Sequence, residues 1–185
     1  MGYNQALEKA WSEIVHSTDA PRFSIKLLAD EYEIDVPGKH ILSLSCNAPA
    51  KEYVSIILLH YLMQKIKLKA LPLPTEEWID FRQLEGGQGY FPTFKKRVID
   101  VILRKYGAHP QALLDAGRRL PIKKAQISDM GIVLQVFPEV PILITLWRAD
   151  EEFSPDAKML FDKSILKIFC TEDIVVLAEF IAHAL

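Results

Sequence analysis

The chain has 185 residues, of which half are hydrophobic and a quarter are charged, and its 22 basic against 24 acidic residues give a net charge of −2. This composition is typical of one globular domain with a core of its own, and it excludes a disordered chain. With only two cysteines, Cys46 and Cys170, it also excludes a disulfide scaffold. The near-neutral charge argues against nucleic acid as a partner, and no apolar stretch is long enough to cross a membrane. Since no signal peptide is visible either, we expect a cytoplasmic protein.

The first half of the chain predicts two helices around a small set of strands. Apolar residues at helical spacing indicate a helix over residues 4–16. Alternation of apolar and polar residues then indicates an antiparallel meander, with strands over 23–27 and 32–36, a link at 29–31 and a third strand from Ile41. An almost uniformly apolar segment predicts a buried helix that begins near Pro49. In chain order this helix covers residues 50–67 and is followed by the extended connector Leu71-Pro72-Leu73-Pro74, where a subregion boundary would lie (70–75).

The second half predicts a buried hairpin among helices. Strands over 132–137 and 141–147 are rich in Val, Ile and Leu, which places them near the centre of a sheet. Ser154-Pro155-Asp156 has the pattern of a helix start, with a cap, a proline and an acid. The remaining expected elements are a weak strand over 78–84, helices over 92–106, 110–116 and 154–169, and a last helix from Thr171. The sequence therefore predicts an α+β fold, with an antiparallel or mixed sheet and helices packed on it in a single compact domain.

A glycine-rich turn is the first candidate ligand site. Backbone N–H groups at the start of a helix favour an anion, and the helix expected from Pro92 begins with basic side chains. The segment from Lys95 to Lys124 contains nine basic and two acidic residues, a local net charge of +7. The segment from Arg148 to Leu185 has a net charge of −4. The alternative is a turn that needs positive φ, followed by a solvated basic helix. The residues assigned to this ligand site are Gly86, Gly87, Gly89, Tyr90, Lys95, Arg82 and His60.

An acidic run is the second candidate site. Asp150, Glu151 and Glu152 follow a buried strand, and Asp162 would join them if the expected helix folds back. Carboxylates gathered in this way could bind a hard cation or transfer protons, so these four are the candidate catalytic residues. The alternative is the ordinary electrostatics of acids at a helix N-terminus.

The histidines and cysteines show no metal-binding spacing. No two of the five histidines are three or four residues apart, and no cluster-binding cysteine pattern occurs. His60 interrupts the apolar helix, where a hydrogen-bonded structural role competes with a role in a pocket. We therefore assign no metal site and name no cofactor.

Several segments together carry a resemblance to a known family. They are Leu59–Leu62, Trp78–Leu84, Gly86-Gly87, Tyr90-Phe91, Leu146–Phe153, Leu160–Asp162 and Thr171–Asp173. They resemble domain of unknown function 3786, whose members occur largely in anaerobic bacteria and archaea, some with an attached iron–sulfur domain of the kind seen in corrinoid proteins. The resemblance implies a setting in anaerobic metabolism rather than a reaction, and any iron–sulfur cluster or corrinoid would come from a partner.

Two functional hypotheses follow from these observations. The first is a non-catalytic accessory domain that binds an anionic small molecule or a protein partner. The second is a small enzyme that uses the acidic cluster. Converging carboxylates in a cleft would favour the enzyme, and dispersed ones would favour the binding domain. A third option, a purely structural interaction protein, would show a large apolar patch and no pocket.

Overall fold

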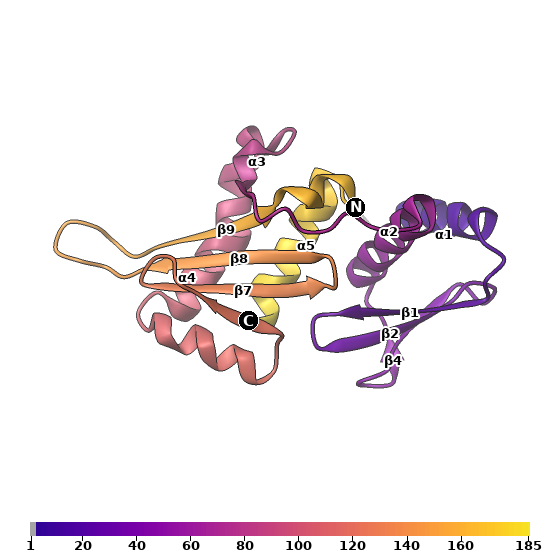
Figure 1. The fold of residues 1–185 in the computed structure, drawn as a ribbon, viewed down its shortest axis with the longest axis horizontal. Coiled ribbons are helices and arrows are strands. Elements are labelled where there is room, and N and C mark those ends of the chain that lie inside the picture. Colours follow the sequence, from indigo (N-terminus) through magenta and orange to yellow (C-terminus); the bar gives the residue numbers. More distant parts are fainter. Residues whose placement is uncertain (1–2) are drawn as a thin grey trace. The chain divides into compact units, whose positions relative to one another are not determined.

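The computed structural model describes residues 3–185, which form two compact units. The first comprises the chain up to Pro72 together with Lys167–Phe169, and the second comprises Leu73–Leu166 and Cys170–Leu185. The chain passes from one unit to the other at Pro72–Leu73, inside the proline-containing connector. Each unit combines helices with an antiparallel sheet, which confirms the α+β class (Figure 1).

A four-stranded sheet in the order β1-β2-β3-β4 forms the first unit's framework. The predicted meander is confirmed, because alternate residues such as Ile25, Ile34 and Ile41 are at most 5% exposed. The link between the first two strands is shorter than predicted: Leu27 pairs with Asp30, so the turn is confined to residues 28–29. The strands are β1 (Arg22–Leu27), β2 (Asp30–Asp35), β3 (His40–Ser43) and β4 (Ala48–Pro49).

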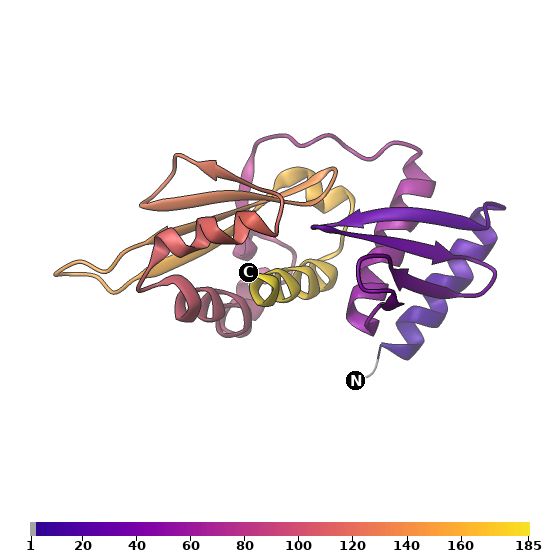
Figure 2. The same ribbon diagram turned by 90° about the horizontal axis from the view of Figure 1, so that it is seen from below.

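Two helices, α1 (Asn4–Ser17) and α2 (Glu52–Leu68), pack against each other and cover one face of this sheet (Figures 1 and 2). Both were predicted. α2 begins later than expected because Pro49 pairs with Leu42 in the sheet instead of opening the helix. Its apolar sequence reflects burial on more than one side, since seven of its residues are buried.

The second unit is built on a five-stranded antiparallel sheet in the order β5-β9-β8-β7-β6. β7 and β8 confirm the predicted hairpin, and β8 is the middle strand, with all residues buried from Val140 to Leu146. The strands are β5 (Trp78–Asp80), β6 (Ile122–Ala125), β7 (Met130–Phe137), β8 (Val140–Trp147) and β9 (Asp156–Asp162).

The predicted helix over residues 154–169 is wrong. The segment forms β9 and then a short 3₁₀ helix, η4 (Lys163–Lys167). Ala157, Met159 and Phe161 are buried, while Lys158 between them is exposed, a period of two that suits a strand. Pairing of residues 156–161 of β9 with the buried strand β8 outweighs the local helix-start signal.

Helices cover one face of this sheet (Figures 1 and 2). The helix predicted from Pro92 begins earlier, at Gly87, and runs without interruption through a π-helical segment. The segments are α3 (Gly87–Phe94), the π-helix η2 (Lys95–Ile99), α4 (Asp100–Tyr106), the 3₁₀ helix η3 (Pro110–Arg118) and α5 (Thr171–Ala184). The last two lie where the sequence predicted helices.

Stacked aromatic rings join the helical layer to the sheet. The Phe81 and Phe94 rings stack with centroids 3.9 Å apart, and Phe161 of β9 meets Phe94 edge-on at 6.4 Å. All three side chains are at most 1% exposed. Because such rings bury a large apolar area, they anchor α3 to β9.

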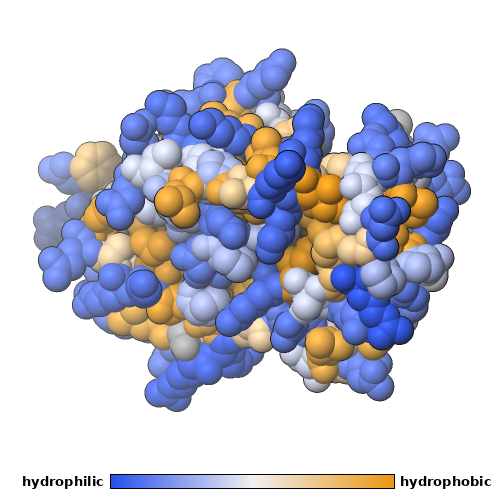
Figure 3. Space-filling model, turned by 45° about the vertical axis from the view of Figure 1, so that its right-hand side comes forward, coloured by the Kyte–Doolittle hydropathy of each residue, from blue (hydrophilic) through white to orange (hydrophobic). Residues whose placement is uncertain are grey.

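The outer surface is largely polar. In Figure 3, hydrophilic side chains form the protruding parts of the face shown, and apolar side chains lie mainly between them. Among the described residues, no helix has the length and apolar character that a membrane crossing requires. Large apolar side chains that do protrude are therefore of interest.

Candidate functional site

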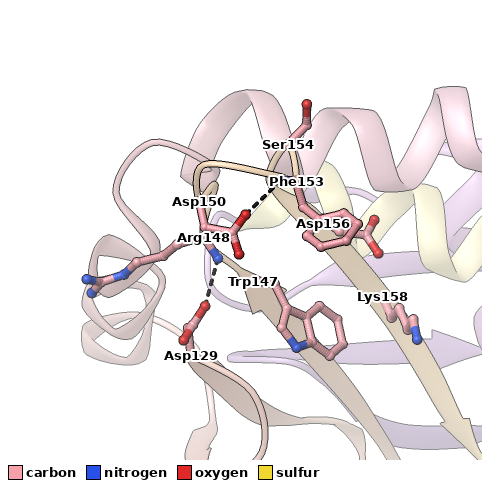
Figure 4. A pocket seen from close by; sticks show the side chains of 8 residues that line it. All are labelled: Asp129, Trp147, Arg148, Asp150, Phe153, Ser154, Asp156 and Lys158. Carbon is pink, nitrogen blue, oxygen red and sulfur yellow. Dashed lines mark hydrogen bonds between the residues drawn. The ribbon is translucent and has the colours of Figure 1, made fainter.

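An open pocket lies where β8 ends and β9 begins. It has a volume of about 530 Å³ and belongs entirely to the second unit. The β6–β7 turn contributes Asp129, and the other residues come from the β8–β9 loop and the adjoining strand ends (Figure 4). The lining residues are Asp129, Trp147, Arg148, Asp150, Phe153, Ser154, Asp156 and Lys158.

Two carboxylates give the β8–β9 loop its shape. Asp150 Oδ1 accepts hydrogen bonds from the N–H groups of Glu152 (2.9 Å) and Phe153 (2.7 Å), and the Asp150 N–H donates to the Phe153 carbonyl at 3.0 Å. Asp129 Oδ2 accepts from the Arg148 N–H at 2.8 Å. Aspartates stabilise turns in this way because the short carboxylate replaces a backbone acceptor. One face of the pocket is thereby held in a defined conformation.

Two aromatic rings form the apolar part of the pocket. Trp147 is half-buried, and the Lys158 Nζ lies 5.1 Å from the centroid of its ring. The β8–β9 register pairs Trp147 with Asp156 and Thr145 with Lys158, so Trp147 and Lys158 are diagonal neighbours on one sheet face. Phe153 in the loop is 68% exposed. The large apolar side chain of Phe153 is thus exposed to solvent near the cation–π pair of Trp147 and Lys158.

Carboxylates outnumber cations around the pocket. Three aspartates line it against Arg148 and Lys158. Figure 4 shows the Arg148 side chain directed away from the Trp147 ring, whereas Asp156 lies near the Phe153 ring. Among residues 3–185, no hydrogen bond or ion pair engages the Asp156 carboxylate, so it is available to a ligand.

A second cation–aromatic pair adjoins the pocket. Arg82 donates from Nε to Asp80 Oδ1 (2.8 Å) and from Nη2 to Oδ2 (3.0 Å), and its guanidinium lies 4.7 Å from the Phe91 ring centroid. Burial alone would raise the pKa of Asp80, but the hydrogen bonds and charge of Arg82, with help from Lys158, hold that pKa below its ordinary value. The Asp80 contacts, and more weakly the charge of Asp156, raise the pKa of Arg82. The pocket and this pair therefore share one electrostatic environment.

The acidic candidates are not brought together. Asp150 lines the pocket, while Glu151 and Glu152 are exposed and do not line it. Asp162 ends β9, roughly 20 Å along the strand from its start at about 3.3 Å per residue. The helix that would have folded Asp162 back toward the loop is absent, because that segment is a strand.

Asp162 instead acts as a buried structural acceptor. It is 1% exposed and accepts hydrogen bonds from the Thr75 N–H (3.0 Å) and hydroxyl (3.0 Å), the Glu76 N–H (2.7 Å) and the Ser164 N–H (2.9 Å). Burial alone raises its pKa, but the hydrogen bonds from Ser164, Thr75 and Glu76 bring the pKa below the ordinary 3.8. A charged carboxylate saturated by donors is a poor proton-transfer group.

The predicted glycine turn has a structural explanation. Gly86 has φ of +69° and precedes α3, as the alternative interpretation required. Gly87 is buried, and a Cβ there would lie 2.0 Å from the Phe81 carbonyl oxygen. Gly89 has open space around it. The turn therefore allows α3 to approach η1 (Phe81–Gln83) closely.

The basic candidates beside the turn bind other parts of the second unit. Lys95 Nζ pairs with Asp100 at 2.6 Å, and Tyr90 accepts a hydrogen bond from Arg97 at 3.4 Å. Arg97 also pairs with Glu179 of α5 at 3.1 Å, and Lys105 donates to two carbonyls at the end of α5. Part of the basic segment thus faces the acidic C-terminal segment.

His60 lies on α2 in the first unit, whereas the other ligand-binding candidates belong to the second unit. It is half-buried, and its neighbour Tyr61 is 1% exposed and stacks on Phe169 with centroids 6.4 Å apart. Within the first unit, His60 therefore lies beside a buried aromatic contact.

Sequence reasoning missed most of the pocket lining. Asp129, Lys158 and Asp156 were not assigned to a site, although the loop that contains Asp150 was singled out. The signal that could have found them is the alternation of residues 157–161, because a hairpin with β8 places Lys158 beside Trp147. Within residues 3–185, no group of His, Cys, Asp or Glu side chains could hold a metal ion.

Comparison with known proteins identifies a family but no characterised relative. No curated protein and no solved structure matches the chain. The family model described as "Domain of unknown function (DUF3786)" matches residues 6–184, nearly the whole chain. The protein therefore belongs to this family.

Proposed function

We propose that this protein is a non-catalytic binding domain whose ligand or partner docks in the pocket beside Trp147. The observation that carries the proposal is an open cavity of about 530 Å³ next to two accessible aromatic rings, Trp147 and Phe153. Rings of this kind supply much of the contact energy in ligand pockets and interfaces, while a few polar groups fix orientation. The aspartates and cations of the pocket would fix the orientation of the ligand or partner.

The placement of the acids supports binding rather than catalysis. Asp150 holds the loop turn through one oxygen, and Asp162 is buried and saturated with hydrogen bonds. Glu151 and Glu152 are exposed outside the pocket. Of the four acids predicted as catalytic, only Asp150 lines the pocket, so the acidic group that the enzyme hypothesis requires is not assembled.

We further propose a setting in the cytoplasm of an anaerobic organism. The family resemblance implies this setting, in corrinoid- or iron–sulfur-linked metabolism. It does not choose between two kinds of occupant for the pocket. A small molecule and a side chain of a protein partner would both meet the Trp147 and Phe153 rings first.

Solution NMR tests the binding proposal directly. The ¹⁵N-labelled protein would be titrated with representative amino acids, dipeptides, nucleotides and amines. We expect at least one class to shift the Trp147 indole N–H and the backbone amides of residues 148–156, while the Trp11 indole in the first unit stays unchanged.

A matched pair of variants controls this experiment. Trp147→Leu should abolish the response, and Trp78→Leu, on the edge strand β5 of the same sheet, should preserve it. Shifts that survive Trp147→Leu, or the absence of shifts at residues 147–156 across the whole panel, would reject the pocket as a binding site.

A further inference from the structure

We infer that the pocket recognises a positively charged group, such as an alkylated ammonium, on the Trp147 ring, and that Lys158 is the resident occupant which this group displaces. The inference rests on the proposed binding function and names the chemistry of the ligand. Its basis is the geometry of the cation–π pair inside an open cavity.

The Trp147 ring already holds a cation in the absence of any ligand. Lys158 Nζ lies 5.1 Å from the ring centroid, within the distance at which an ammonium is attracted to an indole face. Lys158 is otherwise exposed, and no ion pair engages it among the described residues. The ring face is thus a cation site occupied by a flexible side chain that can move into water at little cost.

Unused acceptors line the same pocket as this ring. Asp150 uses Oδ1 for the loop and Asp129 uses Oδ2, so the second oxygen of each carboxylate is left without a hydrogen bond in the described structure. Asp156, opposite Trp147 in the β-ladder, has no hydrogen-bond partner there either. These oxygens would neutralise a cation that replaces Lys158.

An anion finds less support in the same geometry. The two cations of the lining are Arg148, whose side chain Figure 4 shows directed away from Trp147, and Lys158, which lies against the ring. An anion near Trp147 would meet three aspartates. Like charges at short distance oppose binding, so the net negative charge of the pocket lining favours a cation.

The exposed Phe153 gives the cation a second ring. It is 68% exposed at the pocket margin, in a loop fixed by the Asp150 hydrogen bonds. Quaternary ammonium groups are bound by aromatic side chains in this way, because their methyl groups carry the charge against the ring faces. A methylated ammonium therefore suits the pocket better than a small inorganic cation.

Choline and its neutral isostere 3,3-dimethyl-1-butanol distinguish charge recognition from apolar contact. Each would be titrated into ¹⁵N-labelled protein at constant chloride concentration, with the Trp147 indole N–H as readout. We expect choline to shift this signal and to bind about two- to fivefold more tightly than the isostere, the ratio that an exposed cation–π contact provides. Equal affinity for the two compounds would overturn the inference.

Removing the resident cation provides the sharper test. Lys158→Gln should strengthen choline binding about two- to fivefold, because the competing cation–π contact is lost. Lys123→Gln, the same charge change on the edge strand β6 of the same sheet, should leave choline affinity unchanged. Trp147→Phe keeps an aromatic ring and, followed through the backbone amides of residues 148–156 because the indole N–H is absent, should bind choline more weakly, which separates loss of the indole from loss of folding.

The outcomes separate this inference from the function on which it rests. Weaker choline binding in Lys158→Gln, or binding of inorganic phosphate in place of choline, would overturn the cation assignment while the pocket remained a binding site. A pocket that responds neither to choline nor to any member of the wider panel would remove both proposals together.

Discussion

The Asp162 carboxylate joins the end of β9 to the segment that follows the connector. Its four donor groups belong to Thr75, Glu76 and Ser164, and the next residue, Lys163, pairs with Glu77 Oε2 at 2.8 Å. A buried charge is tolerated only where donors compensate for lost hydration. The Asp162 side chain thus fixes the segment at Thr75 and Glu76, near the start of the second unit, to the end of β9.

Asp162→Asn should destabilise the protein by about 2–3 kcal/mol, since an amide NH₂ would face N–H donors and leave them unsatisfied. Urea unfolding followed by circular dichroism measures the change. Asp156→Asn, the same substitution at the exposed start of β9, is the matched control and should change the free energy of unfolding little. Equal effects of the two substitutions would argue against a structural role for Asp162.

The same carboxylate makes stability depend on pH in the acid range. Because the pKa of Asp162 in the folded protein lies below the ordinary 3.8, its contribution is complete well above 3.8 and is lost as the pH falls below it. The parent protein should therefore lose more free energy of unfolding than Asp162→Asn between about pH 5 and about pH 2. Parallel stability curves for the two proteins would contradict this explanation.

Close packing of α3 requires a glycine at position 87. A methyl group there would meet the Phe81 carbonyl oxygen at 2.0 Å, so the backbone would have to move. We expect Gly87→Ala to destabilise the protein by about 1–3 kcal/mol in thermal or urea unfolding. Gly89→Ala, two residues along the same helix in open space, should stabilise it by about 0.5–1 kcal/mol. The same sign for both substitutions would contradict the close-packing explanation.

At the scale of elements, the β8–β9 hairpin decides where the candidate site lies. Its two strands pair from Ile142 with Phe161 to Trp147 with Asp156, and the loop beyond this last pair carries Asp150 and Phe153. Loops are commonly mobile unless their backbone groups are bound. Asp150 binds two of them, which keeps Phe153 beside the pocket.

Asp150→Ala should loosen the loop without unfolding the sheet. Hydrogen exchange at the Glu152 and Phe153 amides should accelerate, because their acceptor is lost, while the exchange of β8 amides stays unchanged. Glu151→Ala removes a neighbouring exposed acid and serves as the control. Unchanged exchange at both amides in Asp150→Ala would show that the carboxylate does not hold the loop.

The helix that spans α3, η2 and α4 illustrates competing local signals. The proline at position 92 marked a helix start in the sequence, yet the helix begins five residues earlier at Gly87. The glycines made that region resemble a turn, but only Gly86 has a positive φ, and Gly87 packs against the Phe81 backbone. Local composition could not distinguish a glycine needed for a turn from one needed for close packing.

At the scale of the whole molecule, each unit is built on a sheet of its own. The first carries four strands and the second carries five, and the chain passes between the units at the prolines of the connector. The candidate pocket is assembled from two stretches of the second unit, the β6–β7 turn and residues 147–158. A ligand there would contact residues far apart in sequence, such as Asp129 and Lys158, that only the sheet brings together.

The sequence by itself determined the class of fold and most of its elements. Apolar periodicity located α1, α5, β1 and β2, because burial of one face leaves a period of two or nearly four in the chain. Continuous apolar runs located α2, β7 and β8, because these elements are buried on more than one side. It also identified the loop around Asp150 as a place where polar side chains gather at a strand end.

Only the tertiary structure decided what residues 154–169 become and which side chains form the site. The helix-start signal at Ser154 rests on three neighbouring residues, whereas the pairing of β9 with β8 involves residues 156–161. That pairing moved Asp162 out of the acidic group and placed Lys158 beside Trp147. Which side chains meet depends on which strands pair and in which register, so the chemistry of the pocket emerged only with the fold.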